Sequence, residues 1–174
     1  MIGVLLSLLL LFQADAPAFS AAPGESGAWL LQDGAWSPIQ PAPVSEVKTR
    51  GLGNYIYTNG YTNLDMDISF AGPGAAMRVS DRRPVFMAAQ PGNDGYEPVL
   101  VRLERKKDRR VCRTRPPSAS IGNKQGFRRQ DILRTVITVN PDKSFIVRPE
   151  RPLKPGEYLF VTGTSEYGHD FGID

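Results

Sequence analysis

The stretch Arg151–Gly163, RPLKPGEYLFVTG, decides the fold of this chain. Pro155 fixes φ and Gly156 permits a tight turn, so one strand should end before them and another begin after them. The run Tyr158–Val161 is apolar and rich in aromatic and β-branched residues, as strands are. Tyr158 can bury its ring and satisfy its hydroxyl locally. The stretch therefore predicts a structural corner between two strands, built by Leu153, Pro155, Gly156 and Tyr158.

Short strands separated by turn signals fill the rest of the chain. Asp33-Gly34 lies between the apolar flanks of Ala28–Ile39 and predicts a hairpin, and Asn59-Gly60 is a second turn signal. In Leu64–Phe70 apolar residues alternate with Asp65, Asp67 and Ser69, which predicts a strand with one buried and one solvated face. Further strands are expected within Met77–Val79, Arg82–Gln90, Glu97–Arg115 (as a hairpin), Ile132–Val139, Phe145–Arg148 and Gly168–Asp174.

These patterns predict an all-β protein, a single antiparallel β-sandwich. No helix longer than about two turns is expected. The chain has 174 residues, 41% hydrophobic and 22% charged, which suits one domain with a genuine core.

The N-terminus indicates export from the cytoplasm. The apolar run Ile2–Phe12 has the length of a signal-peptide core and is shorter than the ~20 residues that span a bilayer. Cleavage after Ala18 or Ala22 would leave a signal peptide over 1–22 and a β-sandwich domain over 23–174. We expect the mature protein in the periplasm or outside the cell, without a transmembrane segment. Cys112 is the only cysteine, so no internal disulfide is expected, and we interpret it as a small apolar strand residue.

The corner resembles the one that precedes the penultimate strand in immunoglobulin-like and fibronectin-III-like sandwiches, where a Tyr bonds back to the backbone. Together with Gly27–Ile39, Val79–Phe86 and Val99–Arg110, the ending LxPGEY…DFGxD resembles a layout of uncharacterised bacterial exported single-domain proteins. The resemblance implies immunoglobulin-like closing strands and an extracytoplasmic location. It supplies no catalytic residue and no cofactor.

A basic segment is the most distinctive feature of the charge pattern. Glu97–Arg134 holds twelve Lys or Arg against four acids, a balance of +8, while the whole chain is +3. Such a patch can attract an anionic membrane surface or other anionic envelope components. Without interleaved aromatic residues, nucleic acid is disfavoured. Alternatively, the charge protects an edge strand or is neutralised across strands. The candidate anion-binding residues are Arg105, Lys106, Lys107, Arg109, Arg110 and Arg113.

For each residue that could take part in catalysis, the sequence favours a structural role over a catalytic one. His169 is the sole histidine, and no nucleophile motif accompanies it. Glu166, His169 and Asp170 lack the further ligands of a metal site. Asp65 and Asp67 are two apart on one strand and are interpreted as its solvated side. We therefore predict no enzyme, cofactor or metal, but an exported non-enzymatic binding, structural or assembly module. Its partner would be an anionic envelope surface or another envelope protein; an accessory enzyme or metal-dependent module is the less favoured alternative.

Overall fold

The computed structural model describes residues 26–51, 56–57, 65–89, 97–115, 126–162 and 167–174. The expected signal peptide, the Asn59-Gly60 turn and Glu166 lie outside these ranges. Within them, no helix has the length and apolarity needed to cross a membrane.

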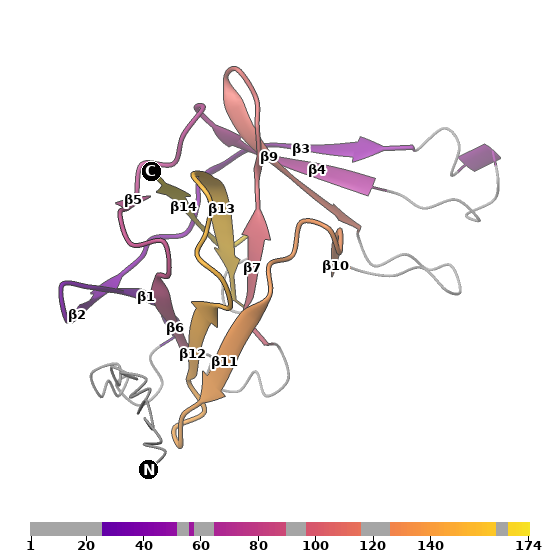
Figure 1. The fold of residues 1–174 in the computed structure, drawn as a ribbon. Coiled ribbons are helices and arrows are strands. Elements are labelled where there is room, and N and C mark those ends of the chain that lie inside the picture. Colours follow the sequence, from indigo (N-terminus) through magenta and orange to yellow (C-terminus); the bar gives the residue numbers. More distant parts are fainter. Residues whose placement is uncertain (1–25, 52–55, 58–64, 90–96, 116–125, 163–166) are drawn as a thin grey trace, which may run out of the picture.

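The described residues form three sheets, which confirms the all-β prediction (Figure 1). The first sheet has the order β11 (Thr135–Val139), β12 (Phe145–Pro149), β6 (Val85–Ala89), β1 (Gly27–Gln32) and β2 (Ala35–Pro38). The second has the order β5 (Arg78–Val79), β14 (His169–Ile173), β13 (Gly156–Val161) and β7 (Val99–Arg102). The third has the order β10 (Gly126–Phe127), β9 (Arg109–Arg115), β4 (Asp65–Ala71) and β3 (Val44–Arg50), with β8 (Glu104–Arg105) also paired to β9.

The first two sheets pack face to face as a sandwich. Their shared core includes Leu30, Phe86 and Val147 from the first sheet and Phe160 and Phe171 from the second. The rings of Phe86 and Phe160 stack with centroids 4.7 Å apart, a separation favoured by aromatic pairs. Phe171 and Ile173 point inward, as the closing pattern predicts.

The second sheet is also covered on its other face, by the third sheet. Leu159 and Val101 of the second sheet contact a separate cluster that holds Ile68, Phe70 and Cys112 of the third. The second sheet is thus the middle layer of three. This position explains the unbroken apolar run of β13, because a strand buried on both faces has no solvated side.

The corner predicted before β13 is present. The Tyr158 hydroxyl donates a 2.6 Å hydrogen bond to the carbonyl of Lys154, and Tyr158 is 1% exposed. Gly156 has φ 156°, a conformation that L side chains rarely adopt. The corner therefore depends on the glycine for its backbone and on the tyrosine for its closing bond.

Two features of the topology correct the sequence prediction. One pairing, β5 with β14, is parallel rather than antiparallel, because the chain crosses from β4 in the third sheet before it joins the edge of β14. The hairpin expected over Glu97–Arg115 is correct only for β8 and β9. At Leu103, whose N–H donates to the Glu157 carbonyl at 2.9 Å, the chain leaves the second sheet for the third, so β7 and β9 lie in different sheets.

Candidate anion-binding pocket

Arg110 is buried, so its prediction as an anion-binding residue is wrong. Arg110 is 2% exposed and lies over the ring of Phe70, 6.0 Å from the centroid. Its Nη1 donates to the carbonyls of Ala71, Gly72 and Gly74 at 2.7, 3.0 and 2.7 Å. Its Nη2 pairs with the Asp170 carboxylate. Because Arg110 lies on β9 of the third sheet and Asp170 on β14 of the second, this cation serves the packing of the two sheets.

The other five candidate anion-binding residues are divided between internal pairs and the turn of the β8–β9 hairpin. Arg113 Nε donates to Asp67 at 2.7 Å, Lys106 pairs with Glu104, and Arg109 lies 3.9 Å from Glu46. Arg105 and Lys107 are exposed and form no ion pair with another described residue. The local neutralisation considered from the sequence is thus observed. The edge-protection alternative is wrong for β9, which is paired on both sides.

The polar face of β4 is not solvated at Asp67, which corrects the interpretation of Asp65 and Asp67 as the solvated side of their strand. Asp67 and Ser69 are 6% and 4% exposed. The arms of Arg113 and Arg50 reach Asp67 from the neighbouring strands and cover it. Burial acts to raise the pKa of Asp67, but hydrogen bonds and charges from Arg113 and Arg50 outweigh it, and the pKa lies below its ordinary value. Asp67 is a paired structural carboxylate.

The residues considered for catalysis or metal binding do not lie together in one site. Asp65 and Asp67 belong to the third sheet, whereas His169 packs against Phe160 in the second, with ring centroids 6.5 Å apart. His169 is 3% exposed, and neither ring nitrogen has a hydrogen-bond partner among the described residues. Cys112 is 1% exposed, and burial raises the pKa of its thiol to about 12, so it is an unreactive core residue. Within the described ranges, no three potential metal ligands gather.

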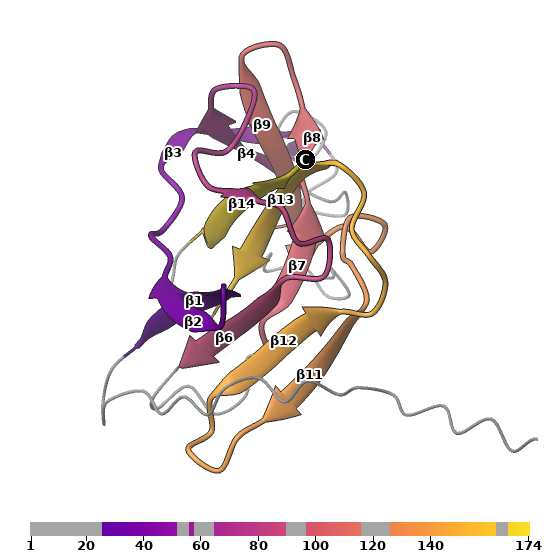
Figure 2. The same cartoon turned by 60° about the vertical axis from the view of Figure 1, so that its left-hand side comes forward.

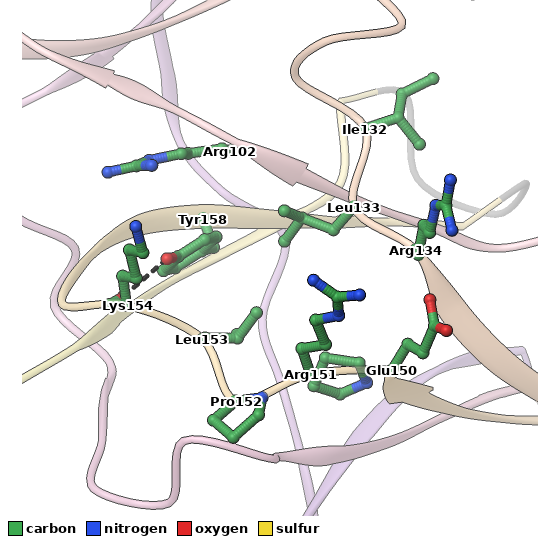
Figure 3. Close-up of a pocket in the computed structure, with 11 residues that line it drawn as sticks. Arg102, Ile132, Leu133, Arg134, Glu150, Arg151, Pro152, Leu153, Lys154 and Tyr158 are labelled. Carbon is green, nitrogen blue, oxygen red and sulfur yellow. Dashed lines mark hydrogen bonds between the residues drawn. The ribbon is translucent and has the colours of Figure 1, made fainter.

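The structure instead forms a pocket of about 440 Å³ at the corner between β12 and β13, which the sequence analysis missed (Figure 3). Its apolar wall includes Leu133 and the buried Leu153, and the ring of Tyr158 lies at one end. The volume lies within the range of small-ligand sites, about 300–1,000 Å³. The lining residues are Arg102, Ile132, Leu133, Arg134, Pro149, Glu150, Arg151, Pro152, Leu153, Lys154 and Tyr158.

Four cations and one acid line this pocket. None of the four forms an ion pair with another described residue, although all are exposed and one carboxylate lines the same pocket. In Figure 3, Arg102 and Lys154 lie toward the Tyr158 end and the others lie beyond Leu133. The four are Arg102, Arg134, Arg151 and Lys154, and the acid is Glu150. A cationic rim around an apolar wall suits an anionic group attached to an apolar body.

The pocket cations come from three different segments of the chain. Arg102 ends β7 and Arg134 immediately precedes β11, while Arg151 and Lys154 flank the buried Leu153 on the β12–β13 connection. Leu153 is fixed by its N–H, which donates to the Arg82 carbonyl at 2.7 Å, and by its own carbonyl, which accepts from Arg82 Nε at 2.7 Å. The corner fold therefore anchors the connection and directs charged residues around a buried leucine.

One sequence signal could have found the pocket. The predicted corner already contained Arg151 and Lys154, two cations beside a motif that fixes the backbone.

Burial raises the pKa of Tyr158, while the charge of Arg102 acts to lower it, so the phenol stays protonated as the donor of the corner bond.

Comparison of the chain with family models, with curated proteins and with solved structures gives no match. The fold and the pocket define its class: an all-β protein of packed antiparallel sheets that carries a basic corner pocket.

Proposed function

We propose that this protein is a non-enzymatic binding module that takes an anionic group into the corner pocket. The observation that carries the proposal is a set of cations around an apolar wall that form no ion pair with another described residue. Grouped like charges repel one another, and a fold gains nothing by holding them together unless an anion joins them. Carboxylate, phosphate and sulfate all match the donors that Arg presents.

The proposal includes an immunoglobulin-like arrangement of the sandwich and a role outside the cytoplasm. Supporting it, the order β11-β12-β6-β1 corresponds to strands D-E-B-A and the order β14-β13-β7 to strands G-F-C, if the third sheet is treated as two insertions. The Tyr158 bond then occupies the corner between strands E and F, as in that fold. The leader pattern supports export.

A direct test measures the binding of small anions. Phosphate, sulfate and succinate would each be titrated into the chain by calorimetry and by thermal shift, at constant ionic strength. We expect at least one of them to raise the melting temperature, and the Arg134→Gln/Arg151→Gln double variant to lose that response. A matched control, Arg105→Gln/Lys107→Gln, removes the same charge from the hairpin turn and should keep the response. Equal responses in both double variants would refute the pocket as the site.

The hairpin turn supports a second candidate function. Arg105, Lys106, Lys107 and Arg109 surround an exposed turn that projects from the third sheet (Figure 2). These charges could bind an anionic membrane surface or lipopolysaccharide through salt-sensitive attraction. Co-sedimentation with vesicles that contain phosphatidylglycerol, over a salt series, distinguishes the two. Vesicle binding lost in Arg105→Gln/Lys107→Gln and kept in the pocket variant would favour the hairpin.

A further inference from the structure

Most sheet edges of the described residues carry a feature that discourages pairing with another chain. The edge strand β3 bears Glu46, Lys48 and Arg50 and has a bulge next to Val44. β5, β8 and β10 are two residues long, and β2 ends at Pro38. Charges, bulges, prolines and short length are the usual means of protecting an edge.

The edge of β7 is covered instead by the segment that leads into β11. Arg102 N–H donates to the Asp131 carbonyl and Leu133 N–H to the Leu100 carbonyl, each at 2.8 Å. The outer edge of β7 is thereby occupied by the chain itself.

β11 lacks all of these protections. Its five residues, Thr135–Val139, are all β-branched and uncharged. Val136 and Val139 are 56% and 60% exposed. It pairs only with β12 among the described strands and is the outermost strand of the first sheet (Figure 2). An edge of this composition readily accepts another strand.

The register shows which backbone groups of β11 are free. Beyond the two ends of the β11–β12 pair, Asn140 N–H donates to the Ser144 carbonyl at 2.8 Å and Glu150 N–H to that of Arg134 at 3.0 Å. Hydrogen-bonded pairs alternate along an antiparallel ladder, so the even-numbered residues of β11 bond to β12. The N–H and C=O groups of Thr135, Ile137 and Val139 therefore point away from β12, toward the free edge.

The free edge of β11 and the corner pocket are continuous, because Arg134 lines the pocket and directly precedes Thr135. We propose that they form one peptide-binding site, in which an extended segment of a partner protein adds antiparallel to β11 with its carboxyl-terminal end in the pocket. An antiparallel strand beside β11 runs toward Arg134, so its terminal carboxylate would arrive among the four cations. Antiparallel pairs are the commoner kind, and strand addition with carboxylate capture is an established mode of peptide recognition.

This inference rests on the proposed function, since it names the ligand of the same pocket. It goes beyond a small anion because it assigns the backbone of β11 a role. The body of the peptide would bond to the outward N–H and C=O groups of three β11 residues, which pair with no second described strand. Its alternate side chains would lie beside Val136 on the exposed face.

The test selects ligands without assuming their sequence. A phage library of random heptapeptides with free carboxyl termini would be panned on the chain, and enriched peptides synthesised as acids and as amides. We expect enrichment of β-branched residues before the terminus, and binding by fluorescence anisotropy that weakens about tenfold or more on amidation. No enrichment, or equal binding of acid and amide, would overturn the proposal.

Matched variants separate the edge from the pocket. Thr135→Pro/Val139→Pro removes two free N–H groups, and Pro is tolerated at an edge whose N–H faces outward. Thr135→Ala/Val139→Ala removes the same side chains and keeps the donors. We expect the proline pair to weaken peptide binding about tenfold or more relative to the alanine pair. Equal affinities of the two pairs would overturn strand addition.

A measurement on the unmodified chain guards against misfolding of the proline pair. Added peptide should slow amide hydrogen exchange at Thr135, Ile137 and Val139, and unchanged exchange there would overturn the proposal. If sedimentation shows a dimer that the proline pair dissociates, a second copy occupies the edge and the proposal is wrong. The proposed function fails separately: small anions that bind while no peptide does would leave the pocket valid and refute only the peptide.

Discussion

Two groups of basic residues in this protein differ in how the fold uses them. On β9 and its hairpin, Arg110 and Arg113 are drawn into pairs with Asp170 and Asp67. In the corner pocket, Arg134 and Arg151 are exposed and form no ion pair within the described part of the chain. The denser group in the sequence is thus the one with more paired cations: Arg113 lies opposite Asp67 on the neighbouring strand β4, and Arg110 reaches Asp170 in the second sheet.

A candidate anion site is therefore marked by cations that are available to a ligand, rather than by a high density of cations in the sequence. A paired cation contributes to stability, and its removal should cost free energy of unfolding. An unpaired cation in a group of like charges contributes little, and its removal should cost almost nothing. Substitutions in the two groups should therefore differ in their effect on the free energy of unfolding.

The largest effect is expected at Arg110. Arg110→Met keeps much of the stem volume but leaves the Asp170 carboxylate and three backbone carbonyls without their donor. Because both charges lie in a buried contact between sheets, we expect a loss of about 3–5 kcal/mol in the free energy of unfolding, measured with urea. The control Arg105→Met should stay within about 0.5 kcal/mol of the parent chain. Similar values for both would show that Arg110 is no more structural than the hairpin turn.

The next effect is expected at the end of the pocket. Tyr158→Phe removes only the hydroxyl that donates to Lys154, and should cost about 1 kcal/mol. Tyr57→Phe, at a residue 89% exposed, is the matched control and should have no measurable effect. Since the bond fixes the connection that bears Arg151 and Lys154, the Tyr158 variant should also bind anions more weakly. Unchanged stability would show that the bond does not hold the corner.

The sequence predicted the strands and the corner well, because these depend on local patterns. Asp33 and Gly34 have φ values of 50° and 78°, which are the conformations that the turn signal demands. The third sheet was not predicted. Its strands come from two separate segments of the chain, β3 and β4 from one and β8, β9 and β10 from the other. The pairing of β4 with β9 joins partners distant in sequence that no local pattern encodes.

The same limit explains the errors on individual residues. The alternation around Asp67 correctly separated two faces of β4, but solvation of the polar face depended on Arg50 and Arg113 from the adjacent strands. The pocket was missed because its cations come from β7, the segment before β11 and the corner, and only the corner was recognised as fixed. Local sequence predicts an element's type more reliably than what packs against it.

A pH-dependent effect is expected from the buried histidine. Burial lowers the pKa of His169 below its ordinary value of 6.5 and outweighs the charge of Asp170, which acts to raise the pKa. The folded state therefore favours the neutral ring. The stability that comes from the neutral ring is fully present above the unfolded-state pKa. It is lost as the pH falls from that value toward the lower pKa of the folded state. Urea unfolding between pH 7.5 and 5 should show this loss in the parent chain.

The variant His169→Leu should lack that pH-dependent component. His169 is the only histidine of the sequence, so no second imidazole titrates in this window. An equal loss of stability on acidification in the leucine variant would show that other groups cause it. The effect concerns packing between β14 and Phe160 and should leave anion binding by the corner pocket unchanged.

The smallest effect on stability is expected in the pocket itself, and it separates the two basic groups most clearly. Arg134→Gln/Arg151→Gln breaks no ion pair of the described residues and relieves repulsion among the four cations. We expect the free energy of unfolding to change by no more than about 0.5 kcal/mol, and to rise rather than fall at low salt, where repulsion is least screened. Arg113→Gln, which deprives the buried Asp67 of a partner, is the comparison from β9 and should destabilise. A loss above about 1 kcal/mol in the pocket variant would mean that these arginines hold the corner together, and the proposed anion site would then lose the observation that supports it.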